Sequence, residues 1–427
     1  MIVKSYFPSQ VVSDLEKMSY DYGLKVAKAI EAEWFHTERG TNRYTTNHNN
    51  FHNLRLYARG EQSTQKYKDE LSINGDLSYL NLDWKPVPII PKFVDIVVNG
   101  IAERMYDVKA YSQDPFGVTK RTEYMESILR DMQTREFNDM AQTEFNIDLY
   151  ENAKEDLPDT QEELELHMQL SYKQAVEIAE EQALNTLFNG NKYELIKKQF
   201  YYDLTVLGIG AVKTSFNTSE GVVIDYVDPA DIVYSYTESP YFDDVYYVGE
   251  VKTIPINELV KQFPHLDQSE LEDIVKNKSY HKTNYNQGYN RNEHDVNKVQ
   301  VLYFNYKTYM NETYKVKETG TGGDKILPKD DSFNPPQDEG NFGKLQKSVE
   351  CLYEGALLLG TGKLLKWEMA KNMMRPKSDY TKCKMNYSIV APRMYKGRIE
   401  SLVSRITGFA DMIQLTHLKL QQVLSRM

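Results

Sequence analysis

The sequence predicts an α+β fold, with helices first, antiparallel strands next and one long helix last. Apolar residues recur at helical spacing through much of the first 190 residues. From about residue 200, apolar and polar residues alternate, as in strands with one buried face. Helical spacing returns near the end of the sequence. We therefore predict four regions, at 1–115, 116–200, 201–392 and 393–427.

The composition is that of ordinary folded soluble proteins, with 41% apolar and 26% charged residues. No run approaches the roughly 18 apolar residues of a membrane-spanning helix, and the N-terminus lacks the apolar core of a secretory signal. The two cysteines, Cys351 and Cys383, exclude a disulfide framework and suit a reducing cytoplasm. We expect two buried thiols, with a single disulfide between them as the alternative. Tyrosine outnumbers phenylalanine by 32 to 16, which favours a protein that assembles with others.

Charge is unevenly distributed along the chain, whose net charge is -11. Residues 123–181 hold 17 acids and four bases, whereas residues 363–427 hold 13 Lys and Arg and four acids. Separate acidic and basic parts predict a charged partner or a second copy of the chain.

The first region, 1–115, is predicted to begin with a helix over residues 10–35. The Asn-rich segment 39–53 is predicted to be a loop. Pro91 can occupy the first turn of another helix, where its missing N–H costs nothing. The residues expected to line that helix's buried face are Phe93, Val94, Val97, Val98 and Ile101.

The second region, 116–200, is predicted to contain two long helices, over 118–148 and 161–189. Leu157-Pro158-Asp159 separates them, and their polar faces carry the acidic excess.

The third region, 201–392, is predicted to be rich in antiparallel strands. The strands expected from alternation lie at 201–216, 221–229 and 243–253. Short helices are expected from Pro255 and from Asp267, where Glu270 completes a capping-box pattern. Residues 296–318 are predicted to form a hairpin turning near Asn311, followed by a mobile loop at 319–343 that is rich in Gly, Pro, Asp and Asn.

A phosphate-binding loop is suggested by Gly360-Thr361-Gly362-Lys363 within GALLLGTGKLLKW, but the pattern is incomplete. Leu357 and Leu364 stand where such a loop needs Gly and Ser or Thr. Alternation on both sides predicts an antiparallel hairpin with glycines at its tip. Gly208-Ile209-Gly210 likewise lacks the third glycine of a dinucleotide fingerprint. We therefore expect no nucleotide cofactor.

Three carboxylates in IDYVDPADIV, from Asp225, Asp228 and Asp231, are candidate metal ligands. They keep a metal-dependent nucleic-acid-processing enzyme as an alternative function. Asp-Pro commonly starts a turn, however, so bonds to nearby backbone are the favoured role. His48 and His52 lack a Cys or acid to complete a zinc set, and we expect them in a surface loop.

The last region, 393–427, is predicted to be a helix with an apolar face and a basic face. The basic residues Arg398, Arg405, Lys419 and Arg426 lie at multiples of seven from one another. They could form a solvated face, pair with acids of a neighbouring subunit, or face a polyanion. The predicted apolar stripe consists of Ile399, Leu402, Val403, Ile406, Ala410, Ile413, Leu420 and Leu424.

Several segments, in this order, resemble the portal proteins of tailed double-stranded DNA bacteriophages. They are YARGEQ at 57–62, PIIPKFVDIVVNGIAERMYDVKAYSQDP at 88–115, YYDLTVLGIGAVKTSFN with VIDYVDPADIVYS and FDDVYYVGEVKTIPINEL, and KGRIESLVSRITGFADMIQLTHLKLQQV near the end. The Tyr- and Asn-rich composition is similar to that of proteins from crAss-like phages of the gut.

The resemblance implies a helical wing, an antiparallel β portion and a stem helix that starts in 393–427. It implies a ring of identical copies, typically a dodecamer, at the capsid vertex of the virion, with no catalytic residues and no cofactor. Its partners would be the major capsid protein, tail adaptor proteins, a packaging terminase ATPase and double-stranded DNA passing through the channel without sequence specificity. No membrane partner is expected.

Portals continue through a clip, a second stem helix and a tunnel barrel, which this sequence does not contain. We therefore expect it to be part of a longer protein. Another tail or connector subunit of a phage remains an alternative.

Overall fold

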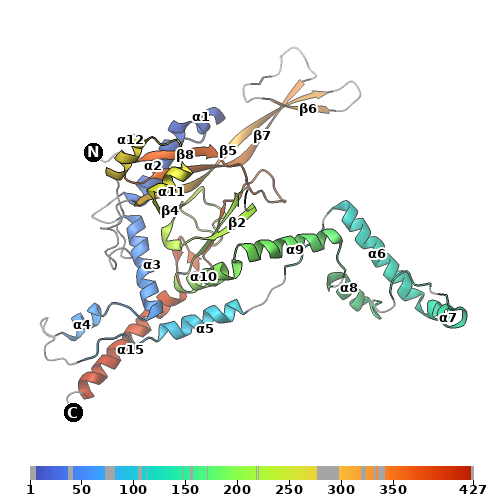
Figure 1. Ribbon diagram of the computed structural model, residues 1–427, viewed down its shortest axis with the longest axis horizontal. Helices are drawn as coiled ribbons and strands as arrows, with labels where there is room; N and C mark the ends of the chain where they lie inside the picture. Colours follow the sequence, from blue (N-terminus) through green and yellow to red (C-terminus); the bar gives the residue numbers. More distant parts are fainter. Residues whose placement is uncertain are drawn as a thin grey trace. The chain divides into compact units, whose positions relative to one another are not determined.

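The computed structural model describes residues 6–36, 42–72, 82–103, 108–112, 114–147, 149–153, 157–170, 172–217, 219, 221–276, 298–318, 324–329, 333–334 and 342–424. These residues form helices and antiparallel sheets, which confirms the α+β class (Figure 1). Contacts divide the chain into two compact units. One comprises Met1–Glu103 with Leu195–Met427, and the other, which we call the acidic unit, comprises Arg104–Glu194.

Two helices stand where one was predicted over residues 10–35. They are α1 (Asp14–Met18) and α2 (Tyr20–Phe35). The chain is extended at Ser19, whose hydroxyl accepts a hydrogen bond from the Tyr22 N–H and so caps α2. Ser19 therefore interrupts a periodicity that alone predicts one continuous helix.

The Asn-rich loop predicted at 39–53 is wrong, because α3 spans Arg43–Arg59. Asn42 caps this helix by accepting the Thr45 N–H at 2.7 Å, and Gly60 ends it with a φ of 73°. The helix buries Tyr44, His48, Phe51 and Ala58. Tertiary packing of these side chains outweighs the weak helix propensity of Asn and Thr.

Helix α4 (Gln65–Leu71) is followed by α5 (Ile90–Ala102), which has Pro91 in its first turn as predicted. Its buried face is narrower than expected. Val94 is buried, but Phe93 is 53% exposed and Ile101 is 38% exposed. Part of the apolar face of α5 is thus left uncovered.

The larger sheet runs in the order β3-β4-β5-β7-β8, with β6 paired to β5. These strands are β3 (Ile232–Tyr234), β4 (Tyr247–Pro255), β5 (Lys298–Glu318), β6 (Asp324–Lys329), β7 (Phe342–Leu358) and β8 (Lys363–Met369). The helices predicted between β4 and β5 are present as α11 (Ile256–Gln262) and α12 (Gln268–Lys276), and the Asp267 N–H donates to Glu270 Oε2 at 3.2 Å.

The smaller sheet runs in the order β2-β1-β9, where β1 is Gly210–Asn217, β2 is Gly221–Tyr226 and β9 is Tyr387–Val390. A two-stranded ladder of β10 (Met394–Tyr395) and β11 (Arg398–Ile399) follows. The strand predicted at 201–216 is wrong in its first part, because α10 (Tyr193–Val206) covers residues 201–206.

The hairpin predicted to turn near Asn311 is also wrong. Strand β5 runs straight through this position, where Asn311 lies opposite Ser348 of β7. The loop predicted at 319–343 contains β6, and its other residues lie outside the described ones except 333–334 and 342–343. In contrast, the hairpin predicted for GALLLGTGKLLKW is confirmed: β7 and β8 are antiparallel, with positive φ at Gly360 and Gly362.

Among its described residues the first unit has three apolar cores, and the two larger ones contain residues of α2, α3, α5 and the last helix, α15 (Leu402–Leu424). One lies where α3, α5 and α15 meet the smaller sheet. The other packs α2 against the larger sheet and includes Trp34, Tyr247 and Tyr306. The Trp34 Nε1–H donates to the Tyr247 hydroxyl at 3.0 Å, so these large aromatic side chains are buried with their polar atoms bonded.

The acidic unit contains α6 (Pro115–Gln133), α7 (Arg135–Phe145), α8 (Gln161–Leu170) and α9 (Ala175–Gly190). The two long helices predicted at 118–148 and 161–189 are each broken, the first at Thr134 and the second between 170 and 175. Residues 104–194 carry 20 acids and nine bases, a balance of -11, so the rest of the chain is neutral. The acidic excess predicted for these helices thus accounts for the net charge of the whole protein.

Helix α15 buries a different set of residues from the one its periodicity predicts. Val403, Ala410, Gln414 and Leu418 are buried, whereas the predicted stripe residues Ile413, Leu420 and Leu424 are 44%, 57% and 61% exposed. Of the helices described, none combines the length and apolar character that crossing a lipid bilayer requires.

Candidate functional site

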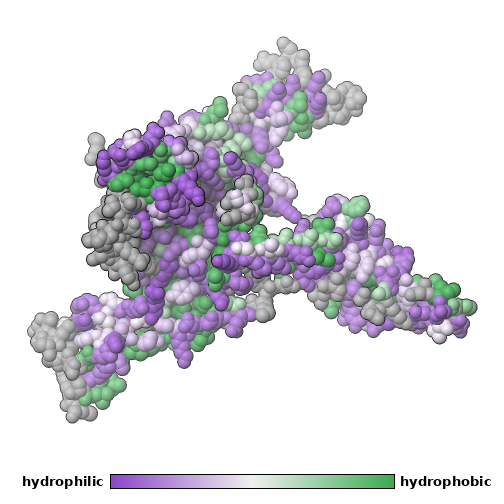
Figure 2. Space-filling model, in the orientation of Figure 1, coloured by the Kyte–Doolittle hydropathy of each residue, from purple (hydrophilic) through white to green (hydrophobic). Residues whose placement is uncertain are grey.

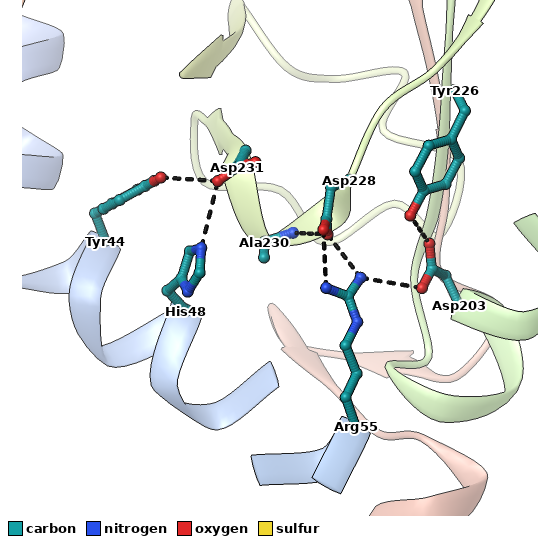
Figure 3. A network of polar contacts seen from close by, with 8 residues as sticks. All are labelled: Tyr44, His48, Arg55, Asp203, Tyr226, Asp228, Ala230 and Asp231. Atoms are coloured by element: carbon teal, nitrogen blue, oxygen red, sulfur yellow. Dashed lines mark hydrogen bonds and ion pairs between the residues drawn. The ribbon is translucent and has the colours of Figure 1, made fainter. Parts of the chain in front are cut away.

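A partly buried network of polar side chains joins α3, α10 and the Asp-Pro turn (Figure 3). Arg55 of α3 donates to both carboxylate oxygens of Asp228, at 2.7 and 2.8 Å, and to Asp203 of α10 at 3.1 Å. A guanidinium that contacts a carboxylate with two parallel hydrogen bonds is held in both position and orientation. Arg55 therefore ties together three segments that are 148 and 173 residues apart in the sequence.

Asp203 is the most buried member of this network, with 3% of its side chain exposed. Its carboxylate also accepts a hydrogen bond from the Tyr226 hydroxyl. Burial raises the pKa of Asp203 to about 6, although the Arg55 charge and the Tyr226 hydroxyl act to lower it. The Asp203 carboxyl group therefore takes up a proton in the mildly acidic range.

Asp228 and Asp231 occupy the two ends of η2 (Pro229–Asp231), the short 3-10 helix of the Asp-Pro turn. Asp228 Oδ1 accepts the Ala230 N–H at 2.9 Å, which is the local backbone bond that the sequence favours. Asp231 Oδ1 accepts the Tyr44 hydroxyl at 2.9 Å and lies 3.4 Å from His48 Nε2 (Figure 3). Both carboxylates thus anchor the turn against α3.

The three carboxylates proposed as metal ligands are not brought together. Asp225 lies exposed on β2, opposite Lys213 of β1, while Asp228 is engaged by Arg55. Within the described ranges, no group of three His, Cys, Asp or Glu side chains could hold a metal ion. His48 is buried in α3, so its predicted place in a surface loop is wrong, as is that of His52.

The predicted basic stripe is only partly helical. Arg398 lies in β11, before α15 begins, so it does not share a helix face with the others. Arg405 and Lys419 both lie on α15 with exposed side chains, and Arg405 Nε is 4.0 Å from the Glu400 carboxylate. Because 14 residues make nearly four helical turns, these two side chains lie on the same side of α15. Arg426 lies outside the described residues.

An apolar groove of about 440 Å³ lies between α5 and α15. Figure 2 shows apolar surface interspersed with polar residues around these two helices. The principal residues that line the groove are Ile90, Phe93 and Val97 of α5 and Ile406, Phe409 and Ile413 of α15. Periodicity alone assigns such residues to the core, so the sequence did not distinguish this groove from buried surface.

The opposite side of α15 is fixed to the rest of the first unit by polar contacts. The Asp411 carboxylate accepts the hydroxyl groups of Tyr57 and Tyr67 at 2.9 and 2.7 Å. The Gln414 side chain accepts the Val87 N–H at 2.8 Å. These contacts hold α15 against α3, α4 and the segment before α5, and leave the groove face open.

The comparisons of this sequence with protein-family models and with curated proteins both give no match. The likeness to portal proteins therefore rests on the sequence segments named above.

Proposed function

We propose that this chain is a structural subunit of a closed ring, a portal-type protein of a tailed double-stranded DNA phage. The observation that carries the proposal is that the portal-like segments share one core. Ala58 of YARGEQ, Val94 of α5, Ile209 just before β1, Ala230 of the Asp-Pro turn and Ala410 of α15 all belong to it. Segments that resemble portals in sequence order thus also form one packed body.

Polar contacts between these segments add support. The Tyr57 hydroxyl of YARGEQ donates to Asp411 of α15, and Arg55 joins α3 to the Asp-Pro turn. A subunit that transmits force needs segments that move together, and buried networks with bonded partners provide such rigidity. The network is therefore understood as structural support and not as a reaction centre.

The distribution of charge suits assembly from identical copies. A ring closes when one surface of a subunit binds a different surface of the next. The acidic unit carries -11, whereas residues 363–427 carry 13 bases against four acids. Surfaces of opposite charge favour the correct encounter between copies and disfavour wrong ones.

In this proposal the ring lies at the capsid vertex of a virion. It contacts the major capsid protein, tail adaptors and a terminase ATPase, and double-stranded DNA passes through its opening. A ring with an overall acidic charge repels the DNA phosphates, which favours sliding over tight binding.

Negative-stain electron microscopy of the purified protein tests the proposal. We expect closed rings with a central hole, with the dodecamer as the expected size. Solitary molecules would overturn the proposal, and open filaments or stacked tubes would favour another tail or connector subunit.

The enzyme alternative is tested separately by incubating the protein with duplex DNA and Mg²⁺ or Mn²⁺. Cleavage that is lost in Asp225→Asn would favour the enzyme, because Asp225 is exposed and its replacement leaves the Arg55 network intact. Asp228→Asn alone is ambiguous, since it also removes a charge that Arg55 binds.

A further inference from the structure

The groove between α5 and α15 exposes large apolar side chains that a folded protein normally covers. Phe409 is 64% exposed, Phe93 is 53% exposed and Ile413 is 44% exposed. Single exposed apolar residues are common, but a contiguous set of this kind marks an interaction surface. The groove lies on two helices that are fixed from behind, so its shape exists before any partner binds.

The same exposed face continues along α15 beyond the groove. Leu420 and Leu424 follow Ile413 at intervals of seven and eleven residues, which is helical spacing, and both are more than half exposed. Arg405 and Lys419 border this apolar face on one side, and Lys92 of α5 is also exposed. The surface is therefore an apolar groove with a basic border.

A complementary surface is present on α7 of the acidic unit. Phe137, Met140 and Phe145 are 66%, 67% and 70% exposed. Phe137 and Met140, three residues apart, share one side of the helix, and Phe145 is its last residue. Glu136 and Glu144, also exposed, lie beside them. Eleven residues make a helix of roughly 16 Å. Helix α7 is thus a short acidic helix with an uncovered apolar face.

We propose that α7 of one copy docks in the α5–α15 groove of the next copy. This inference rests on the proposed ring, and it names the two surfaces that would form its repeating contact. Amphipathic helices commonly bind in apolar grooves through apolar side chains three or four residues apart, as Phe137 and Met140 are. The charges favour this occupant, because Glu136 and Glu144 give α7 an acidic surface while Arg405 and Lys419 give the groove a basic border. The two surfaces share no residue, as a ring with more than two copies requires.

Disulfide trapping tests the contact directly. Met140→Cys and Phe409→Cys are placed in separate chains with different affinity tags, co-expressed, and oxidised after purification. The native Cys351 and Cys383 are 1% and 3% exposed, and burial raises the pKa of both thiols, so they do not compete. We expect a disulfide-linked pair that carries both tags.

A chain that carries both substitutions gives a second readout. If each copy contacts two neighbours, oxidation links the copies in series and yields a ladder of multimers on a non-reducing gel. Doubly substituted chains that remain at monomer mass would overturn the proposal.

The matched control is Gly408→Cys in place of Phe409→Cys. Gly408 is exposed on the same helix, and a Cβ added there would meet no atom within 4 Å, so the substitution is tolerated. It points away from the groove, and we expect no link to Met140→Cys. Equal linking by Gly408→Cys, or linking of Phe409→Cys only to itself, would overturn the assignment of α7 as the occupant. Rings that form without any link would refute this contact and leave the ring proposal standing.

Charge reversal provides an independent test. Arg405→Glu with Lys419→Glu should raise the concentration needed for half-assembly by roughly tenfold, since the border of the groove then carries the same charge as α7. Adding Glu136→Lys and Glu144→Lys should restore assembly. The contact would be contradicted if the double variant assembled as well as the wild type. It would also be contradicted if the variant with all four substitutions assembled no better than the double variant.

Discussion

Arg55 supplies the counter-charge for the buried carboxylate of Asp203 and for the partly exposed carboxylate of Asp228. Its side chain is 15% exposed, Asp203 is 3% exposed and Asp228 is 33% exposed. Pairing a buried charge yields modest net stability, but removing one partner leaves the other uncompensated. Loss of Arg55 should therefore lower the free energy of unfolding by more than the number of hydrogen bonds it makes suggests.

Replacing Arg55 by Met should lower the free energy of unfolding by about 3–5 kcal/mol. Urea denaturation followed by circular dichroism measures this change. The control is Arg59→Met, because Arg59 is 68% exposed and lies 3.9 Å from Glu61; its effect should stay within about 0.5 kcal/mol. Equal effects of the two substitutions would show that Arg55 has no special structural role.

Asp203 should make stability depend on pH in a defined direction. Its pKa is raised from 3.8 to about 6 in the folded protein, so the folded state binds the proton more tightly than the unfolded chain. The free energy of unfolding should therefore fall as pH rises from about 4 to about 6, by about 3 kcal/mol for a shift of this size.

The Asp203→Asn variant removes this titration and should show a flatter stability profile between pH 4 and 7, measured by denaturation at each pH. Asp225→Asn, at an exposed position, should keep the wild-type profile. A wild-type stability that rises across this range would contradict the assignment.

The turn between α10 and β1 depends on Gly208. The N–H groups of Leu207 and Gly208 both donate to the Asp203 carbonyl, at 2.7 and 3.1 Å, and Gly208 adopts a φ of 81°. A Cβ at this position would lie 2.7 Å from the Glu400 carbonyl oxygen, in the segment just before α15. The element boundary and the position of α15 therefore both require glycine here.

Gly208→Ala should destabilise the protein by more than the roughly 1–2 kcal/mol that left-handed backbone costs an L-residue. The matched control is Gly221→Ala, since Gly221 has a φ of 76° but its Cβ would meet no atom within 4 Å. Thermal unfolding compares the two variants. If Gly208→Ala lowers the melting temperature no more than Gly221→Ala does, the close approach to Glu400 does not require glycine at position 208.

The two units differ in how much apolar surface they bury. Among the residues that the structure describes, the core of the acidic unit contains three buried apolar residues, Ile128, Leu157 and Leu164, whereas the first unit buries three much larger clusters. Small cores offset little of the conformational entropy lost on folding. The acidic unit should therefore be the less stable part of the isolated chain.

Amide hydrogen exchange measured by mass spectrometry tests this expectation on the isolated chain. Peptides from α6 to α9 should exchange faster than those from the paired parts of β5 and β7, because local opening there costs less free energy. Ile128→Ala should accelerate exchange across the acidic unit and leave β5 and β7 protected. Uniform protection of both units would contradict a separate, weaker core.

For the molecule as a whole, the sequence predicts which segments are acidic and which are basic, but not where these segments lie in the folded protein. The structure shows that residues 104–194 alone account for the net charge of -11. It also shows that Arg405 and Lys419 border an open apolar face of α15. Charge alone left a solvated face, a subunit contact and a polyanion contact open, and the groove is what favours the subunit contact.

Features that depend on neighbouring residues could be predicted from the amino-acid sequence. The glycine-tipped hairpin between β7 and β8, the start of α5 at Pro91 and the cap at Asp267 all follow from local backbone chemistry. Such preferences act over a few residues, so they can be inferred without knowing the rest of the chain.

Which apolar faces are covered, and which distant charges meet, depends on how the elements pack together. Periodicity shows that α5 and α15 have apolar sides, but not that Phe93 and Phe409 stay exposed. Likewise, a weak helix former such as the Asn-rich α3 becomes helical because Phe51 and Ala58 are buried against other elements. The α5–α15 groove and the ion pairs of Arg55 each join segments that are more than a hundred residues apart in the sequence. The spacing of neighbouring residues gives no information on which distant segments will meet.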